Sequence, residues 1–388
     1  MMLSTSRLNP QAAVAETGPT GAIRGFHLEL PMPICLDRHP PMPDLSVGPQ
    51  ELCGKSPVEF RESDANCIDI GLINNMPGAA LEATERQFRA LLDAAADGIV
   101  VRLSIYALPD MPRTDVSQRH VSSFYSDIRD LWDSHPDGLI VTGTEPRTPN
   151  LTDEPYWGSL TKLLEWAEHH THSAVWSCLA AHAALLYIDG IGRRPLNDKL
   201  FGVFEYARVS DHPLSAQAPP QLQMPHSRWN DIAEDALVTC GYHILTRSDN
   251  AGVDAFVKQR KSLFVFFQGH PEYEADTLLL EYRRDVGRFL RGVRDSYPTI
   301  PHGYFDPDTV DVLSALRERA LSDRHEELLA DFPTTLAAGK LRHTWRSAAV
   351  SVYRNWLLYL CAQKARQLEA RHGRSGYERL RAAAFGSS

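Results

Sequence analysis

From residue 65 onward, short β-rich runs alternate with amphipathic helical segments, and this alternation constrains the possible folds more than any other feature. The first β-rich runs are residues 68–74, 99–108, 138–141 and 173–178, and the helical patterns between and after them are residues 79–96, 121–132, 155–170 and 179–188. Further strands are predicted at residues 202–209, 241–247, 252–258 and 262–268, and a long helix at residues 273–294. Such an alternation is typical of a sheet that helices cover on both faces. The sequence therefore predicts an α/β fold with a mostly parallel sheet.

The two ends of the chain differ in composition from this central part. Eight of the 26 prolines fall in the first fifty residues, with little periodicity between them, which is typical of an extended arm. The last eighty-odd residues are helical in pattern, with an apolar and aromatic stretch at 345–360. We expect a Pro-rich extension at 1–64, an α/β catalytic core at 65–300, and a helical segment packed on that core at 301–388.

Charge and hydropathy exclude several classes of protein. The chain carries 40 basic and 49 acidic residues, for a net charge of −9, and no stretch concentrates Lys and Arg as a nucleic-acid binder would. The longest mostly apolar run, residues 174–188, is interrupted by Ser177 and His182 and is too short to span a bilayer. The first twenty residues lack the layout of a signal peptide. We expect a soluble, cytoplasmic protein without nucleic-acid or membrane partners.

The six cysteines are scattered, and one of them has an unusual position. They are Cys35, Cys53, Cys67, Cys178, Cys240 and Cys361. None forms a CxxC or CxxxC pair, so neither a metal site nor a disulfide framework is indicated. Most such cysteines are small apolar core residues. Cys178, however, stands between a predicted strand and the helix that starts near Leu179, where free backbone N–H groups favour a thiolate and could stabilise an oxyanion.

Two other predicted strand ends carry polar groups that suit catalysis. His270 directly follows the apolar strand 263–267, where a general base is expected. Glu272 lies two residues on and would point the same way in an extended segment, so it could orient the imidazole. The turn after the strand 138–141 contains Gly143, which lets the backbone approach a ligand. The N–H of Thr144 is thus a second candidate oxyanion donor, with a plain βα turn as the alternative.

These residues belong to a larger set of short motifs that occur in one order along the chain. The motifs are INNMP at 73–77, FY at 124–125, DGLIVTG at 137–143, YW at 156–157, DKLFGV at 198–203, PHSR at 225–228, GHPEY at 269–273, RD at 284–285, WRS at 345–347 and NW at 355–356. In these motifs the chain resembles the homoserine O-succinyltransferase and O-acetyltransferase family, which has the class I glutamine-amidotransferase-like, flavodoxin-like fold. The resemblance implies an acyltransferase of methionine biosynthesis. In that family a cysteine takes an acyl group from acyl-CoA and passes it to the hydroxyl of L-homoserine.

The resemblance also implies roles for individual residues. Cys178 matches the nucleophile, His270 the base and Glu272 its orienting partner. Lys199 and Ser227 match positions that contact the substrate or the acyl donor. Arg284 matches the residue that binds the amino-acid carboxylate, and an arginine can hold a carboxylate through two hydrogen bonds. The family further implies a homodimer, acyl-CoA as cosubstrate, no bound cofactor and no metal.

One position bears on the choice between succinyl and acetyl donors. In the family, a Glu shortly after the Thr-Gly turn accompanies acetyl transfer, and a small residue accompanies succinyl transfer. Arg147 stands there in this chain, and its charge would attract the distal carboxylate of a succinyl group. We therefore expect succinyl-CoA rather than acetyl-CoA.

The chain departs from the family pattern at other places. Gly78 and Ala79 replace a usual Lys-Lys pair, and His182 replaces a usual Gln. The sequence leaves three alternatives open. The same chemistry could act on serine or another hydroxy amino acid, the chain could be a glutamine amidase of the same fold, or it could be a binding or regulatory relative without activity.

Overall fold

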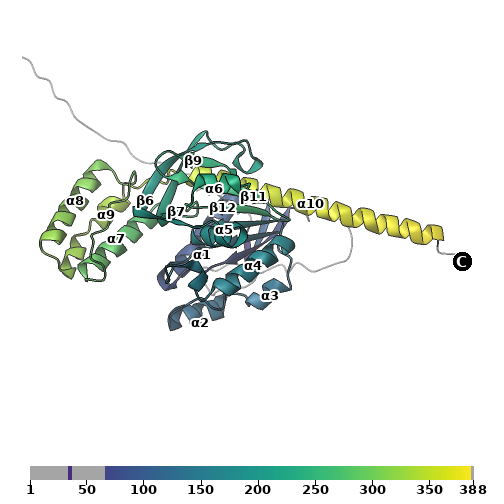
Figure 1. Cartoon of the computed structure of the whole chain (residues 1–388), viewed down its shortest axis with the longest axis horizontal. Helices are drawn as coiled ribbons and strands as arrows, with labels where there is room; N and C mark the ends of the chain where they lie inside the picture. The colour runs from purple at the N-terminus through teal and green to yellow at the C-terminus, as the bar shows by residue number, and fades with distance from the viewer. Residues whose placement is uncertain (1–33, 37–65, 386–388) are drawn as a thin grey trace, which may run out of the picture. The chain divides into compact units, whose positions relative to one another are not determined.

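The computed structural model describes residues 34–36 and 66–385 (Figure 1). The predicted extension at 1–64 therefore lies outside the described residues, apart from the strand β1 (Ile34–Leu36). Within the described part of the chain, no helix combines the length and the apolar character needed to cross a membrane.

An eight-stranded sheet forms the centre of the fold. Its order is β1, β3 (Val100–Tyr106), β2 (Cys67–Ile73), β4 (Gly138–Val141), β5 (Ser173–Ser177), β12 (Leu263–Phe267), β11 (Ala255–Gln259) and β8 (His243–Ile244). All neighbours from β1 to β12 are parallel, and the last two pairs are antiparallel. Because β5 and β12 are parallel neighbours, the residues that follow Ser177 and Phe267 emerge at the same edge of the sheet. The prediction of an α/β fold with a mostly parallel sheet is confirmed.

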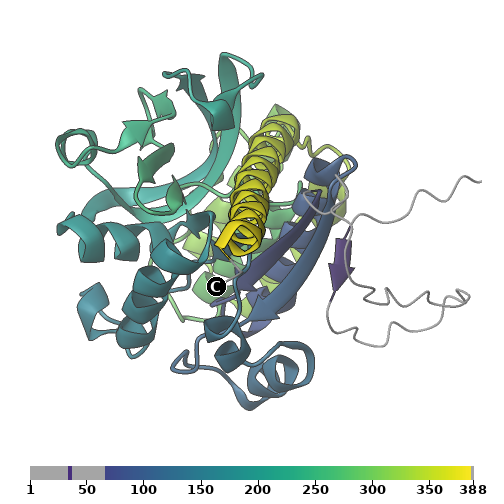
Figure 2. The same cartoon turned by 90° about the vertical axis from the view of Figure 1, so that its right-hand side faces the viewer.

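Helices cover both faces of this sheet, and each face has its own apolar core. One face packs against α3 (Ile128–Trp132), α4 (Trp157–His170), α5 (Leu179–Asp189) and α6 (Glu234–Thr239). The other packs against α1 (Gly78–Ala96) and α10 (Arg346–Phe385), the long helix that Figure 2 shows lying along the strands. Trp356 of α10 is buried, and its indole N–H donates to Ser173 Oγ at 2.9 Å. The buried indole thus finds the polar partner that such a group requires.

A second, antiparallel sheet stands beside the first and was not predicted. Its order is β10 (Gly252–Val253), β9 (Thr246–Ser248), β6 (Arg194–Arg208) and β7 (Gln221–Asp231). The predicted strand 202–209 is only the second half of β6, and β7 was missed altogether. Proline disfavours a strand prediction because it lacks an N–H donor, and Pro195 and Pro225 lie inside these two strands.

Two predicted helices have different bounds in the structure. The predicted helix 121–132 is wrong: α2 (Asp115–Phe124) ends at Tyr125, and α3 starts after Asp127, whose carboxylate caps it by accepting the N–H of Arg129. The break coincides with the buried Tyr125, whose hydroxyl accepts a hydrogen bond from Asn74 and donates one to Glu85. The predicted helix 273–294 is the shorter α7 (Thr277–Leu290).

The remaining elements are helical. They are η2 (Leu151–Asp153), η3 (Pro213–Ser215), α8 (Pro307–Ser322), η4 (Glu326–Asp331) and α9 (Thr334–Ala338). The helices α7 to α9 share a third apolar core with Phe201 and Val203 of β6. One face of the β6–β7 hairpin is thereby fixed against α7, and this places polar groups of both elements next to each other.

Candidate active site

Cys178 occupies a sharp turn between β5 and α5. Its backbone has φ 52° and ψ −114°, a left-handed conformation that costs a non-glycine residue about 1–3 kcal/mol. The surroundings enforce it: the Cys178 N–H donates to the Phe267 carbonyl at 2.7 Å, and Leu179 immediately begins a helix. The thiol is half-buried. A strained residue at the start of a helix is the arrangement that presents a nucleophile to a substrate.

His270 and Glu272 lie at the neighbouring strand end, next to Cys178. His270 Nδ1 is 2.9 Å from Glu272 Oε1, and Cys178 lies close enough to the imidazole to raise its pKa. Since Nδ1 faces Glu272, Nε2 is the ring nitrogen available to the thiol. The two residues meet for a different reason than predicted: residues 270–273 form a turn, closed by the Tyr273 N–H and the His270 carbonyl, and not an extended segment.

The charge balance around His270 favours its protonated form. Burial lowers the pKa of His270, but the charges of Cys178 and Glu272 and their hydrogen bonds raise it, and the result lies well above the ordinary value. The ring of Tyr273 stacks on the imidazole at 4.2 Å. The histidine is therefore held in its protonated form between a carboxylate and an aromatic face, next to the Cys178 side chain.

The loop before His270 leaves no room for a side chain at Gly269. A Cβ there would lie 2.7 Å from Met224 Cγ, 2.8 Å from Asp254 Oδ1 and 2.9 Å from His226 Cε1. The Gly269 N–H donates to Asp254 at 2.7 Å, and the His270 N–H donates to the Pro225 carbonyl at 3.0 Å. These contacts fix the backbone that carries the imidazole.

The turn after β4 lies close to the sharp turn at Cys178, as Gly143 in the sequence suggested. A Cβ on Gly143 would lie 2.9 Å from the backbone nitrogen of Leu179. The first N–H groups of a helix have no partner inside the helix, so the Leu179 N–H is available beside the thiol. Thr144 follows Gly143 directly and is half-buried. The loop that carries Thr144 therefore lies next to the turn at Cys178. An oxyanion site that uses the N–H groups of Leu179 and Thr144 would need these two segments to be neighbours.

A second cluster of polar residues forms where β6 and β7 meet α7. It contains three residues predicted from the sequence, Lys199, Ser227 and Arg284, arranged around Glu281. Ser227 Oγ donates to Glu281 Oε2 at 2.6 Å, Lys199 Nζ lies 3.6 Å from the same oxygen, and an Arg284 nitrogen lies 3.9 Å from it. The Tyr273 hydroxyl donates to Glu281 Oε1 at 2.6 Å. Because Tyr273 stacks on His270, this cluster is connected to the catalytic candidates.

Glu281 was missed in the sequence, although a signal exists. Burial raises the pKa of Glu281, but Lys199, Ser227, Tyr273 and Arg284 lower it, and the result lies below the ordinary value. The carboxylate is therefore ionised at the centre of the cluster. Glu281 and Arg284 lie three positions apart on one helix, so they share a face of α7. This spacing could have indicated Glu281 once Arg284 was chosen.

Arg147 lies outside this cluster, on the loop between β4 and η2. Its side chain is exposed, while its backbone N–H donates to the buried Glu154 carboxylate at 2.6 Å. The guanidinium has no ion pair among the residues that the structure describes. Arg147 thus stands three residues after Thr144 with its charge free.

A buried polar network lies behind the catalytic candidates. His226 is fully buried, accepts or donates a hydrogen bond at 2.8 Å with Tyr206, and lies 3.8 Å from Asp254. Burial raises the pKa of Asp254 to about 6. His182, one helical turn after Cys178, is buried against Gln268 at 2.9 Å. None of these groups was predicted from the sequence as part of the site.

His182 is expected to make the protein sensitive to acid, because its side chain is buried. Burial lowers the pKa of His182 to about 4, so the folded protein keeps this side chain neutral while the unfolded chain protonates it below about pH 6.5. Stability is therefore present above that pH and falls as the pH drops toward 4, by about 3 kcal/mol for this residue alone. Replacing His182→Gln keeps an amide next to Gln268, and we expect urea unfolding to show a smaller loss between pH 6.5 and 4.

The matched control for this prediction is His169→Gln. His169 is exposed at the end of α4, so this variant should follow the native pH dependence. An equal loss in the His182 variant and the native protein would assign the acid sensitivity to other groups, of which His226 is the first candidate because burial lowers its pKa as well.

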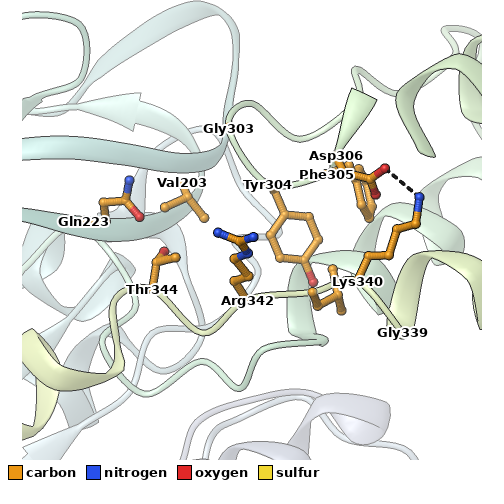
Figure 3. Close-up of a pocket in the computed structure, with 11 residues that line it drawn as sticks. Val203, Gln223, Gly303, Tyr304, Phe305, Asp306, Gly339, Lys340, Arg342 and Thr344 are labelled. Atoms are coloured by element: carbon orange, nitrogen blue, oxygen red, sulfur yellow. Dashed lines mark hydrogen bonds and ion pairs between the residues drawn. The ribbon is translucent and has the colours of Figure 1, made fainter. Parts of the chain in front are cut away.

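A cavity of about 750 Å³ lies along the face of the β6–β7 hairpin that packs against α7 (Figure 3). Its lining comprises Val203, Gln223, Gly303, Tyr304, Phe305, Asp306, Gly339, Lys340, Leu341, Arg342 and Thr344. In Figure 3 Arg342 lies beside the ring of Tyr304, and Lys340 pairs with Asp306. None of the site residues predicted from the sequence lines this cavity. The candidates gather instead at the strand ends and around Glu281.

Comparison with known proteins identifies the chain's relatives. Residues 51–367 match the family model described as homoserine O-succinyltransferase. A homoserine O-succinyltransferase from Rhodopseudomonas palustris is 44% identical over 332 residues, which cover 86% of this chain and all of that protein. One from Methylorubrum extorquens is 44% identical over 290 residues, covering 75% of this chain and 86% of the relative.

Solved structures with a similar arrangement are more distant. A glutamine amido transferase from Methylobacillus flagellatus covers 76% of this chain and 95% of its own, with 14% identity and a TM-score of 0.43. A glutamine amidotransferase from Thermotoga maritima covers 76% of this chain and 98% of its own, with 11% identity and a TM-score of 0.40.

Proposed function

Because the chain belongs to the homoserine O-succinyltransferase family, we propose that it transfers a succinyl group from succinyl-CoA to the hydroxyl of L-homoserine, a step of methionine biosynthesis. The observation that carries this proposal is the grouping of Cys178, His270 and Glu272 at two adjacent strand ends, with His270 Nδ1 2.9 Å from Glu272. The same three residues match the family's nucleophile, base and orienting carboxylate.

In the first half of the reaction, the Cys178 thiolate attacks the thioester carbonyl of succinyl-CoA. The carbonyl oxygen becomes an oxyanion, which the N–H groups of Leu179 and Thr144 stabilise. The C–S bond to CoA then breaks, and the His270 imidazolium gives its proton to the departing sulfur. The products are free CoA and a succinyl thioester on Cys178.

In the second half, neutral His270 takes the proton of the homoserine hydroxyl as its oxygen attacks the acyl-enzyme. The same N–H groups hold the second oxyanion, and the Cys178 thiolate leaves. Glu272 keeps Nδ1 of His270 occupied, so Nε2 handles the proton in both halves, and it stabilises the imidazolium each time it forms. The enzyme ends each cycle as the same ion pair that started it.

The cluster around Glu281 is our candidate for the homoserine site. Arg284 is partly exposed and carries donors that fit the amino-acid carboxylate. Ionised Glu281 aligns Lys199 and Ser227 beside it. The stacking of Tyr273 on His270 connects this cluster with the base that activates the hydroxyl.

Arg147 is our candidate for recognition of the acyl group. Its free guanidinium would bind the distal carboxylate of the succinyl chain, which acetyl lacks. We expect Arg147→Glu to lower kcat/KM for succinyl-CoA by about 100-fold, because an attraction becomes a repulsion, while acetyl-CoA loses much less. Steady-state rates with both donors measure this, and equal losses would count against Arg147.

A panel of acceptors and donors tests the function as a whole. Homoserine and serine are each combined with succinyl-CoA and acetyl-CoA, and the release of CoA and the O-acyl product are measured. The proposal expects homoserine with succinyl-CoA to be the fastest pair. A preference for serine would change the acceptor, and release of ammonia from glutamine without acyl transfer would replace the proposal by an amidase.

The homodimer expected from the family stays a prediction. Mass photometry of the purified protein tests it, with a single species at one chain's mass as the outcome that would contradict it.

A further inference from the structure

The loop that carries Arg147 is tied down by one buried carboxylate. Glu154 is 3% exposed, and its Oε1 accepts the Arg147 N–H at 2.6 Å, the Thr148 N–H at 2.8 Å and the Thr148 hydroxyl at 2.9 Å. One carboxylate oxygen thus accepts from two backbone N–H groups of the loop and from a hydroxyl that also contacts the Asn150 carbonyl at 2.7 Å. Charge-assisted hydrogen bonds of this kind are about twice as strong as neutral ones.

A second tie holds the far side of the same loop. Arg193, which precedes β6, donates to the Pro149 carbonyl at 3.0 Å. The guanidinium is half-buried and close enough to the Glu154 carboxylate for their charges to interact. Glu154 and Arg193 therefore fix residues 147–149 from two sides.

The start of the loop, at Thr142 and Gly143, is fixed next to the turn at Cys178. The Thr142 hydroxyl accepts the Asn75 N–H at 2.8 Å, and Gly143 lies against the backbone nitrogen of Leu179. The loop is thus held at the oxyanion donors and again at Arg147, while the Arg147 side chain itself projects free. The buried carboxyl group of Glu154 thus holds the backbone of Arg147, whose side chain has no partner among the described residues.

We infer that Glu154 is the positioning residue that sets acyl-donor selectivity, by holding the backbone of Arg147 at a fixed place relative to Cys178. This inference rests on the proposed function, because it assumes that Arg147 binds the distal carboxylate of the succinyl group. A long arginine side chain loses conformational freedom when it binds a carboxylate. A backbone that is already fixed spares the further loss of ordering the loop on binding, and only the donor that has the carboxylate benefits.

The test compares Glu154→Ala with Glu154→Gln. The alanine variant removes all three hydrogen bonds, and we expect the ratio of kcat/KM for succinyl-CoA to that for acetyl-CoA to fall about tenfold. The change should come from the KM for succinyl-CoA, with the KM for homoserine unchanged. The glutamine variant keeps an oxygen acceptor of the same size and should restore most of the ratio.

Asp153→Asn is the matched control. It removes a negative charge at the adjacent position, where the carboxylate contacts Asn150 and not the loop amides, so the donor ratio should stay at the native value. Thr148→Val removes the hydroxyl, which contacts Glu154 at 2.9 Å and the Asn150 carbonyl at 2.7 Å, but keeps both backbone N–H bonds to Glu154, and it should lower the ratio by a smaller factor of about two to three. This milder variant decides the matter if the alanine variant does not fold.

Two results would overturn the inference. A folded Glu154→Ala protein with the native donor ratio would show that the hydrogen bonds of Glu154 to the loop do not govern donor selectivity. Equal losses with both donors, in Glu154→Ala or in Thr148→Val, would assign Glu154 a purely structural role. Failure of the proposed function is distinct from both, because the native protein would then transfer neither acyl group to homoserine.

Discussion

The Cys178→Ala protein is expected to lose succinyl transfer by a factor of about 10⁴ or more, because no other group can form the acyl-enzyme. The native protein, mixed with succinyl-CoA in the absence of homoserine, should gain the mass of one succinyl group in intact mass spectrometry. The alanine variant should gain none. The fold itself should tolerate the change, since the thiol is only half-buried.

Cys240→Ala is the control for this experiment. Cys240 is also half-buried but caps α6, away from the strand ends that carry His270 and Cys178, so its loss should leave the adduct and the rate unchanged. If the native protein accumulates no adduct until homoserine is added, and the rates depend on both substrates together, then transfer is direct and the covalent mechanism is wrong.

Glu272→Gln is expected to lower kcat by about 10³-fold while substrate binding changes little. The amide cannot stabilise the imidazolium, so the pKa of His270 falls once the charge and hydrogen bond of Glu272 are gone. The ion pair between His270 and Cys178 then becomes less populated at neutral pH. The rate of Cys178 alkylation by iodoacetamide reports on this pair directly, and its pH profile should move to higher pH.

The control for this prediction lies two residues further on. Glu274 is partly exposed and faces His343 at 4.0 Å, so Glu274→Gln removes the same charge without touching the imidazole. It should keep the native kcat and the native alkylation profile. A Glu272 variant whose alkylation profile does not move would show that the carboxylate only shapes the turn, and that the imidazolium is stabilised by other groups.

The parallel sheet could be predicted because its strands are buried on both faces. Runs such as Leu263–Phe267 and Gly138–Val141 are apolar at every position, and this pattern is typical of strands that helices cover on both faces. The β6–β7 hairpin could not be predicted in this way, because its two strands lack such a continuous apolar pattern. Its exposed and buried residues alternate irregularly, it changes register between Pro195 and Leu200, and polar residues occupy positions that face α7.

The candidate site was predictable where chemistry requires a particular residue at a strand end. Cys178, His270 and Glu272 each follow a strand directly, or nearly so, and two adjacent parallel strands bring them together. Glu281 and Glu154 could not be predicted as site residues, because a carboxylate on a helix or a loop is ordinarily solvated. Only burial distinguishes these two, and burial depends on which elements pack against them.

The position of α10 in the chain has a consequence for biosynthesis. The last strand of the parallel sheet ends at Phe267, whereas α10, which covers one face of that sheet with Tyr353, Trp356 and Leu357, begins only at Arg346. On the ribosome, the part of this apolar face that α1 does not cover therefore stays exposed while the intervening residues are made. Such surfaces are aggregation-prone in nascent chains. The emerging polypeptide should consequently be a client of chaperones that shield apolar surface until the final helix docks.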